Sequence, residues 1–476
     1  MTNKSKNYKL FLFICLLVVS LGIYLITLSI SINSDFYFTW YSGKQIWEYH
    51  NLHTNPATHI DLVIQQWLYA VFVYLFHKIG LVGDIGLVVI QNIILGILLY
   101  IFYKQYMGKK LSVMCAIASI LCCFNYMINI RPQIITMIFI VSQILIVNQY
   151  KKTNNIKILF LLIPISILSA NFHNALFLYH IYVMIPYMID KIENKFKIDM
   201  KIIIASLGML LCSFITPYGA DGVLLLYKTS KSKVFDYLAI SEIAPIQLVS
   251  FSGIQILIFL IILLYFIRKG YANKFLVFYG TTAALFMMTL SFRHQVLGVI
   301  VYMYIFSNKQ VVTFLYNVIN NLYVPKIILI IVSIVSLFIG INTFIVGKGE
   351  VCSSVKYTYD CIEKIDDIPK DSHIFNTMNT GPYLEYKGYT DIFIDTRPEL
   401  YTKELCGVDY INKYLILTSG IDKDRTLYSP EEIRPMYEEY DYIMILTTDY
   451  LYVDLKTNEN YTLHTDHNGF VIYKHK

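Results

Sequence analysis

The stretch Leu10–Ile32 (LFLFICLLVVSLGIYLITLSISI) holds 23 residues and no charged side chain. A helix of this length is long enough to cross a hydrocarbon core about 30 Å thick. Lys4, Lys6 and Lys9 precede the stretch, so we expect its N-terminus to stay in the cytoplasm. The run is also longer than the core of a signal peptide. The sequence therefore predicts a retained membrane anchor.

The composition of the whole chain agrees with this start. Of its 476 residues, 56% are hydrophobic and only 15% are charged, whereas soluble domains carry about 25% charged residues. This excludes an ordinary soluble enzyme, and the high hydrophobicity excludes a disordered chain. The net charge of +6 comes without a long basic cluster, so no nucleic-acid partner is expected. We predict an α-helical polytopic membrane protein.

Ten further apolar runs follow the first, which gives about eleven expected spans. They are Asp84–Tyr103, Leu111–Ile128, Ile134–Tyr150, Ile158–Ala170, Ala175–Ile189, Ile202–Thr216, Gln247–Ile267, Phe275–Phe292, Gln295–Phe306 and Ile327–Val346. With this numbering, 18 Lys and Arg residues fall at the N-terminus and in the loops on its side, and 7 fall in the loops on the other side. Because cytoplasmic loops are enriched in these residues, the bias predicts a multi-pass plasma-membrane protein with its N-terminus inside and its C-terminus outside.

Two segments allow more than one interpretation. Ile158–Ile189 is either one tilted helix or two spans with a turn at Asn171–Asn174, and only the turn keeps the flanking lysines on one side. Gln65–Ile79 is apolar but short, and it carries His77 and Lys78. We interpret it as an interfacial or re-entrant helix, the second of two in a first outer loop at 33–83. That loop belongs to a predicted helical domain at 1–346.

The composition changes near Gly347, and residues 347–476 are predicted to form a soluble α/β domain outside the cell. The expected strands are His373–Asn376, Asp391–Asp395 and Tyr442–Thr447, the expected helices are Pro398–Tyr414 and Pro430–Tyr440, and Tyr461–Tyr473 is expected to close the domain as a hairpin. Strands alternating with helices favour a mostly parallel sheet. Asp395 and Arg397, at the end of a strand, are interpreted mainly as an ion pair or a turn cap.

Asp35 is the leading candidate for chemistry, because it stands where the chain leaves the first span. An acid at this place is either solvated or directed into a cavity between helices. Trp40, on the helix that follows, belongs either to an aromatic belt at the membrane interface or to a sugar-stacking surface. The segment 35–47 reads DFYFTWYSGKQIW, and Gln65-Gln66-Trp67-Leu68 follows it.

This order of motifs is similar to that of bacterial GT-C-type membrane glycosyltransferases, most of all a poorly characterised branch of them. Gln65-Gln66-Trp67-Leu68 stands where that branch has His-Glu-Trp-Leu, which removes an acid and a histidine. Later matches, in chain order, are Ala170-Asn171-Phe172-His173-Asn174, Thr216-Pro217-Tyr218-Gly219, Ile240-Ser241-Glu242-Ile243-Ala244-Pro245, Ser291-Phe292-Arg293-His294, Gly381-Pro382-Tyr383-Leu384 and Phe393-Ile394-Asp395-Thr396-Arg397-Pro398. The resemblance extends over nearly the whole chain.

The resemblance implies transfer of a sugar from a polyprenyl-phosphate carrier to a cell-envelope acceptor at the outer face. Asp35 matches the acid that acts as general base or orients the acceptor hydroxyl. The leaving lipid phosphate requires cations, for which the outer side offers Arg293, His294, Lys231 and Lys233, while the lysines are equally well explained as solvated loop charges.

His173 and Glu242 are further substrate-binding candidates, although each is also explained as a polar group that packs a helix turn. No Asp-x-Asp pattern surrounds Asp35, so a divalent cation stays an open possibility. The expected partners are the lipid-linked sugar, a glycan or other envelope acceptor, and the bilayer. The alternative from another class is a non-enzymatic envelope protein or a lipid-linked glycan transporter. Important polar groups would then line both membrane faces rather than one.

Overall fold

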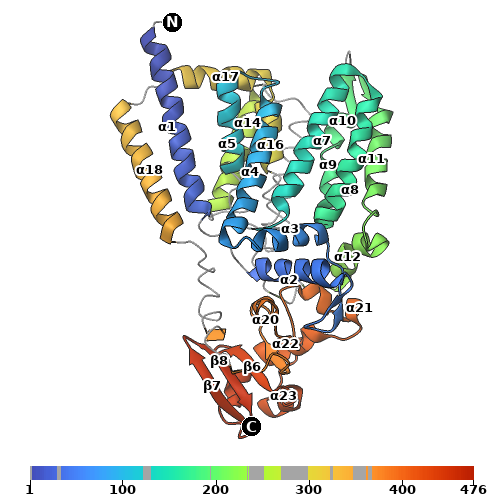
Figure 1. Cartoon of the computed structure of the whole chain (residues 1–476). Coiled ribbons are helices and arrows are strands. Elements are labelled where there is room, and N and C mark those ends of the chain that lie inside the picture. The colour runs from blue at the N-terminus through green and yellow to red at the C-terminus, as the bar shows by residue number, and fades with distance from the viewer. Residues whose placement is uncertain are drawn as a thin grey trace. The chain divides into compact units, whose positions relative to one another are not determined.

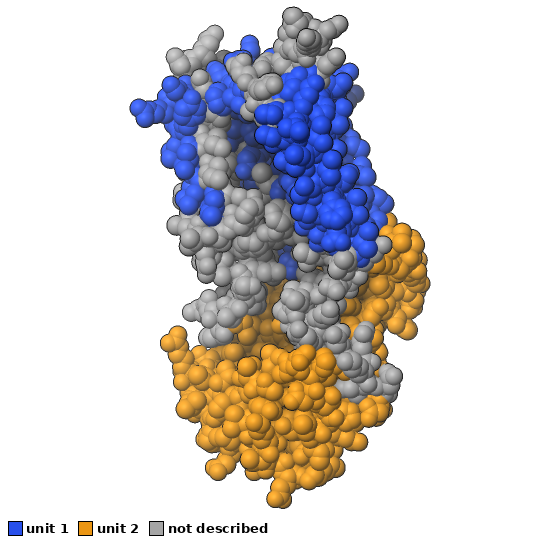
Figure 2. Space-filling view, turned by 90° about the vertical axis from the view of Figure 1, so that its left-hand side faces the viewer, with its two compact units in different colours: residues 1–31, 85–215, 240–349 blue, residues 32–84, 216–239, 350–476 orange. Residues whose placement is uncertain are grey.

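The computed structural model describes residues 3–28, 34–121, 130–192, 195–232, 234, 238, 251–269, 298–321, 325–346, 361–362 and 367–476. The expected span Phe275–Phe292 lies outside these residues. The chain divides into two compact units, coloured in Figure 2. Unit 1 contains residues 1–31, 85–215 and 240–349, and unit 2 contains residues 32–84, 216–239 and 350–476.

Unit 1 is helical (Figure 1). Its helices are α1 (Asn3–Leu28), α4 (Leu81–Tyr103), α5 (Lys109–Leu121), α7 (Gln133–Thr153), α8 (Leu162–His173), α9 (Phe177–Tyr182), α10 (Ile185–Met188), α11 (Met200–Cys212), α14 (Phe251–Arg268), α16 (Gly298–Phe306), α17 (Lys309–Asn321) and α18 (Lys326–Val346). The hairpin β3 (Ile189–Ile192) and β4 (Lys195–Ile198) joins α10 to α11. Side chains from α4, α5, α7 and α16 share one apolar core.

Within the described residues, four helical stretches are long and apolar enough to cross a membrane: Leu81–Tyr103, Gln133–Thr153, Ile156–Met188 and Lys326–Ile345. A fifth is obtained if the pair Gly298–Phe306 and Lys309–Val318, bent by 86°, counts as one span. Three of the four coincide with expected spans, which confirms a membrane protein with several apolar helices. The expected number of eleven spans is not established by these stretches.

The stretch Ile156–Met188 folds back on itself at the position where the sequence predicts a turn. His173 leaves the helical region with φ −161°, and the short 3-10 helix η2 (Asn174–Leu176) follows it. Ser169 Oγ then lies 2.6 Å from His180 Nε2, a distance that a straight helix would not allow for residues eleven positions apart. The segments before and after this turn therefore lie antiparallel and in contact.

Helices α1 and α18 cross at small residues. A Cβ added to Gly340 would lie 2.4 Å from the carbonyl oxygen of Gly22, so neither position has room for a side chain. Ser336 Oγ donates a hydrogen bond to the Val19 carbonyl (3.1 Å), and Ser333 Oγ donates to the Cys15 carbonyl (3.3 Å). Small residues and interhelical hydrogen bonds are the usual means of helix association in lipid.

Unit 2 combines the loop after α1 with the C-terminal part of the chain. The loop provides α2 (Ser34–Tyr49), the two-residue strands β1 (Thr54–Asn55) and β2 (Ile60–Asp61), and α3 (Trp67–His77). Helix α12 (Gly219–Ser232) also belongs to this unit. The helices α2 and α3 lie where the sequence predicts two short helices in the loop.

The C-terminal part holds a four-stranded sheet in the order β5-β6-β8-β7, with β5 (Ile374–Asn376), β6 (Tyr442–Leu446), β7 (Tyr461–His467) and β8 (Phe470–His475). The expectation of a mostly parallel sheet is wrong. Only β5 and β6 pair in parallel, whereas β6–β8 and β7–β8 are antiparallel. The reason is the closing hairpin, which the sequence does predict. Its tight turn makes β7 and β8 antiparallel, and β8 then pairs with the central strand.

The helices of this part follow local sequence signals. Ser429 caps α23 (Pro430–Tyr437) in a capping box with Glu432, which confirms the expected start of that helix. The expected helix Pro398–Tyr414 is instead broken into η4 (Pro398–Tyr401), α21 (Lys403–Cys406) and α22 (Tyr410–Ser419), because Thr402 is extended with ψ 153° and Gly407 adopts a left-handed φ of 79°. Two further helices are α20 (Gly381–Lys387) and α24 (Leu451–Leu455).

Candidate functional site

Helix α2 carries Asp35 in its first turn and packs tightly against α3. A Cβ added to Gly43 would lie 2.0 Å from the backbone oxygen of Ala70, so the two helices approach more closely than any side chain at position 43 would permit. Asp35 is half-buried, and its backbone carbonyl accepts a hydrogen bond from Thr39 Oγ1 (2.6 Å). An acid in the first turn is stabilised by the unpaired N–H groups of the helix start.

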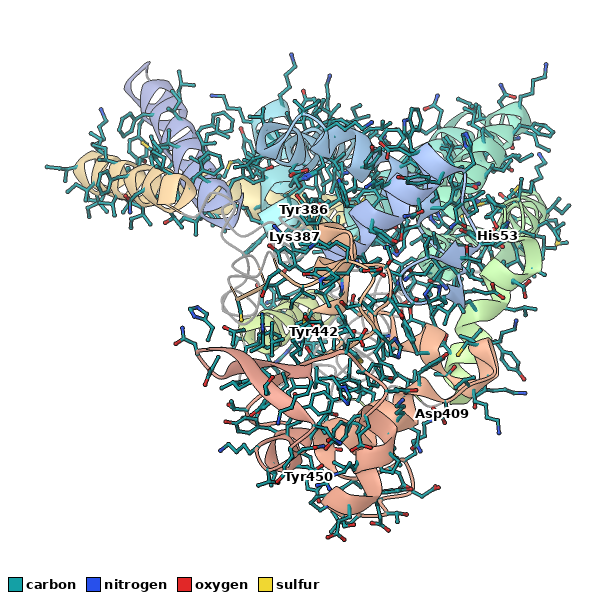
Figure 3. The ribbon with its side chains drawn as sticks, turned by 60° about the horizontal axis from the view of Figure 1, so that its bottom comes forward. His53, Tyr386, Lys387, Asp409, Tyr442 and Tyr450 are labelled. Atoms are coloured by element: carbon teal, nitrogen blue, oxygen red, sulfur yellow. The ribbon has the colours of Figure 1, made fainter. Side chains whose placement is uncertain are left out.

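Aromatic rings surround His77 at the end of α3. The ring centroids of Phe36, Trp40 and Tyr386 lie 5.2, 5.8 and 5.9 Å from that of the imidazole. Trp40 and Tyr386 are themselves 4.7 Å apart in an edge-on arrangement. Tyr386 and the neighbouring Lys387 end helix α20 (Figure 3). These contacts join α2 and α3, from the loop, to α20, from the C-terminal part.

His77 is oriented by a buried acid. Its Nδ1 lies 2.8 Å from Oδ2 of Asp84, whose side chain is 2% exposed. The carboxylate accepts the Nδ1–H bond, and this leaves Nε2 facing the hydroxyl of Tyr386 at 3.4 Å. Asp84 Oδ1 and Trp40 Nε1 are both buried without a hydrogen-bond partner among the described residues.

A second set of polar groups, here named the buried carboxylate cluster, consists of Asn55, Glu385, Asp395 and Arg397. Asn55 Nδ2 donates to Glu385 Oε1 (2.6 Å) and lies 3.4 Å from Asp395 Oδ2. Arg397 Nε lies 3.1 and 3.0 Å from the two Asp395 oxygens, and its NH2 group also contacts Asp395. The expected ion pair between Asp395 and Arg397 is confirmed, and all four residues are buried.

The same arginine reaches helix α2. Its guanidinium carbon lies 5.1 Å from the centre of the Phe38 ring, and its NH1 is 3.5 Å from Ser42 Oγ. Close by, the Ile392 amide donates to the Ala57 carbonyl (2.8 Å). The loop at 33–83, which the sequence groups with the helical domain, is therefore docked in the structure on the C-terminal part of unit 2.

Glu385 has an altered proton affinity in this setting. Burial raises the pKa of Glu385 to about 8, and the charge of Asp395 adds to the rise, while Arg397 and the Asn55 amide oppose it. Its second oxygen, Oε2, is buried and has no hydrogen-bond donor among the described residues. Glu385 is accordingly the group of this cluster that holds a proton at neutral pH.

The structure describes the positions of only some of the predicted site residues. Asp35 and Trp40 share helix α2. Lys231, in the last turn of α12, is exposed, with its Nζ 4.9 Å from the Tyr227 ring centre. His173 belongs to unit 1, where it is buried and its Nδ1 lies 2.7 Å from Thr136 Oγ1. Arg293, His294, Glu242 and Lys233 lie outside the described residues. Convergence of these groups on one pocket therefore stays a prediction, as does a divalent cation, for which the described residues hold no cluster of three or more His, Cys, Asp or Glu.

Comparison with solved structures identifies the fold. The oligosaccharyltransferase of Archaeoglobus fulgidus in its apo form matches with a TM-score of 0.52 and 10% sequence identity, over 100% of this chain and 75% of that chain. The same protein tethered by a disulfide to an acceptor peptide containing the NVT sequon matches with a TM-score of 0.48, 10% identity and coverage of 98% and 74%. This oligosaccharyltransferase is a GT-C-type enzyme. The chain has a GT-C-type fold. No protein-family model and no curated protein matches the sequence.

On this GT-C fold, the sequence did not predict the contacts of four polar residues of the site: His77, Asp84, Asn55 and Glu385. His77 and Asp84 were visible as polar interruptions of apolar runs, but their separation of seven positions gave no sign of contact. Asn55 and Glu385 are 330 positions apart. Only the match of Gly381-Pro382-Tyr383-Leu384 to a motif of GT-C enzymes pointed to α20. A Cβ on Gly381 would lie 2.0 Å from the Ile394 oxygen, so glycine is required for α20 to reach the cluster.

Proposed function

We propose that the protein is a GT-C-type glycosyltransferase that moves a sugar from a polyprenyl-phosphate carrier to a cell-envelope acceptor at the outer face of the plasma membrane. In this proposal the chain crosses the membrane about eleven times, with the N-terminus inside and the C-terminal α/β part outside. Two observations support it: the likeness to a GT-C fold over the whole chain, and an acid at the start of the helix that follows the first apolar segment.

The proposed reaction uses Asp35 as general base. The oxygen of the acceptor hydroxyl attacks the anomeric carbon, Asp35 takes the hydroxyl proton, and the bond from that carbon to the phosphate oxygen breaks. The electron pair leaves with the polyprenyl phosphate, whose charge requires cations. Arg293, His294, Lys231 and Lys233 are proposed for that role. His173, Glu242 and Trp40 are proposed to contact the sugar or the acceptor.

The position of Asp35 carries the proposal, and its substitution tests it. The full-length protein in lipid nanodiscs would be given synthetic polyprenyl-phosphate sugars and an envelope glycan extract, with transfer followed by mass spectrometry. Asp35→Asn should lower the rate of transfer at least ~100-fold while the protein stays folded, because general-base catalysis contributes about that much. Asp61→Asn is the matched control, since Asp61 is an exposed acid in the same loop. Transfer by Asp35→Asn at the control rate would exclude this role.

A further inference from the structure

Helix α2, which carries Asp35, is held on the C-terminal part of unit 2 by groups that come from the far end of the sequence. We propose that Glu385, Asp395 and Arg397 form a proton-sharing clasp that positions α2, and with it Asp35, on the C-terminal part. The clasp itself is a statement about unit 2. Its consequence for sugar transfer rests on the proposed function.

The charges of the cluster do not balance unless a proton is present. Glu385 and Asp395 are 1% and 0% exposed, so neither carboxylate is compensated by water. Arg397 is the cation between them, and its contacts favour Asp395: three nitrogens, counting its backbone N–H at 2.8 Å, reach that carboxylate, whereas the nearest approach to Glu385 is 3.7 Å. Two buried carboxylates beside one cation leave a net negative charge, which is costly in a protein interior.

A proton on Glu385 removes this cost. The two acids are close enough to form a side-chain hydrogen bond, and a protonated Glu385 can donate it while Asp395 accepts. Asn55 Nδ2 meanwhile donates to Glu385 Oε1. When Glu385 is protonated, Asn55, Ser42 and the Phe38 ring join the loop to the C-terminal part through Glu385 and Arg397. When Glu385 loses this proton, a second negative charge is buried at the same contact.

Among the described residues, the other groups around the cluster are neutral. Helix α2 contributes Tyr41 and Ser42, the loop after β1 contributes Thr58, and η4 contributes Tyr401. Burial raises the pKa of the Tyr401 hydroxyl far above its usual value, so it stays uncharged at any physiological pH. Glu385 is thus the group of the clasp whose charge changes near neutrality.

The sign of the pH effect follows from linkage. Folding raises the proton affinity of Glu385, so the native state binds more protons than the unfolded chain between the ordinary glutamate pKa and about 8. Stability from this group is complete below that window and is lost as the pH rises through it. The clasp should therefore hold at pH 6 and loosen at pH 9.

Hydrogen exchange measures this loosening without any substrate. The full-length protein in nanodiscs would be labelled at pH 6 and pH 9, with rates corrected for intrinsic exchange, and peptides from 34–61 compared. The wild type should lose protection there about ten-fold or more at pH 9, as expected for a shift of at least one pH unit. Glu385→Gln, which keeps both hydrogen bonds without the charge, should show little change between the two pH values.

Two variants complete this experiment. Asp395→Asn removes the neighbouring charge but not the burial, so its loss of protection should begin at a lower pH than in the wild type, which keeps the proposal testable if Glu385→Gln does not fold. Glu439→Gln is the control, since Glu439 forms an exposed pair with Lys413 and should behave as the wild type. An equal loss of protection in wild type and Glu385→Gln would overturn the clasp, and so would a wild type whose protection does not change with pH.

Sugar transfer supplies the second readout. In the wild type kcat should fall between pH 7 and pH 9 while KM for the lipid donor is unchanged, and Glu385→Gln should keep its kcat over this range. A parallel decline in both proteins would show that the clasp does not position α2 for catalysis. If the wild type transfers no sugar at any pH, the proposed function fails, and the exchange experiment still decides whether the clasp exists.

Discussion

Arg397 shows most clearly how single residues hold unit 2 together. Its planar group forms a two-pronged contact with Asp395, lies against the Phe38 ring and reaches Ser42, so one side chain connects two distant parts of the chain. A lysine offers one point charge and could not make these contacts together.

Arg397→Ala tests this role. It leaves the Asp395 carboxylate buried without its cation, and breaking a buried pair in this way costs about 3–5 kcal/mol. We expect a markedly lower unfolding midpoint in tryptophan fluorescence of the full-length protein in detergent, because Trp40 lies in the same unit. Glu439→Gln should change stability by less than about 1 kcal/mol. A midpoint for Arg397→Ala equal to that of Glu439→Gln would contradict the assignment.

Residue-level prediction succeeded where partners are close in the sequence. Asp395 and Arg397 are two positions apart, at the end of a strand-like run, and their ion pair could be expected. The contact of Asn55 with Glu385 could not, because no local pattern reports a partner 330 positions away. Asp35 was chosen as a candidate from its place after an apolar run, which is again a local signal, and its role stays a prediction.

At the scale of elements, the joint between α2 and α3 depends on the absence of a side chain at Gly43. Gly43→Ala would put a methyl group 2.0 Å from the Ala70 oxygen, so the helices would have to separate. Overpacking of this kind costs about 1–3 kcal/mol. Fluorescence unfolding should show that loss, whereas Gly86→Ala, where nothing lies within 4 Å of the added carbon, should be neutral or slightly stabilising. Equal midpoints for the two variants would rule out close packing at this joint.

Elements were predictable wherever the chain carries its own start and stop signals. Ser429, Pro430 and Glu432 mark the start of α23, and Asn468-Gly469 marks the turn of the closing hairpin with positive φ at both residues. The interruption of the predicted helix 398–414 was missed because the apolar periodicity continues through Gly407. Periodicity does not show that the backbone of this glycine adopts a left-handed conformation. The antiparallel pairing of most strands was not predicted because the sequence of a strand does not show which other strand it pairs with.

At the scale of the whole molecule, the apolar runs reveal a membrane protein but do not reveal its two units. Composition shifts near residue 347, which suggests a boundary there, while unit 2 also recruits 32–84 and 216–239. Tyr218 illustrates the recruitment: its hydroxyl donates to the Leu52 carbonyl at 2.8 Å, and its ring lies against His53. Such contacts join segments more than 160 residues apart.

Sidedness is the testable property at this scale. In a background in which the eight native cysteines are replaced, Lys456→Cys and Lys104→Cys each place one thiol at an exposed position. The proposed orientation predicts that a membrane-impermeant maleimide labels Lys456→Cys on intact cells and Lys104→Cys only after permeabilisation. The reverse pattern would invert the topology, and labelling of both on intact cells would refute the predicted number of spans between them.

The pairing of Asn55 with Glu385 has a consequence for biosynthesis. A ribosome that has just released residues 34–61 must still translate more than 300 codons before α20 and the Asp395 segment emerge. Throughout that interval the amphipathic α2 and its buried polar partners are without their final contacts, which is the state that chaperones and membrane proteases recognise. Nonsense mutations that stop translation before codon 385 should therefore leave the loop permanently without these contacts.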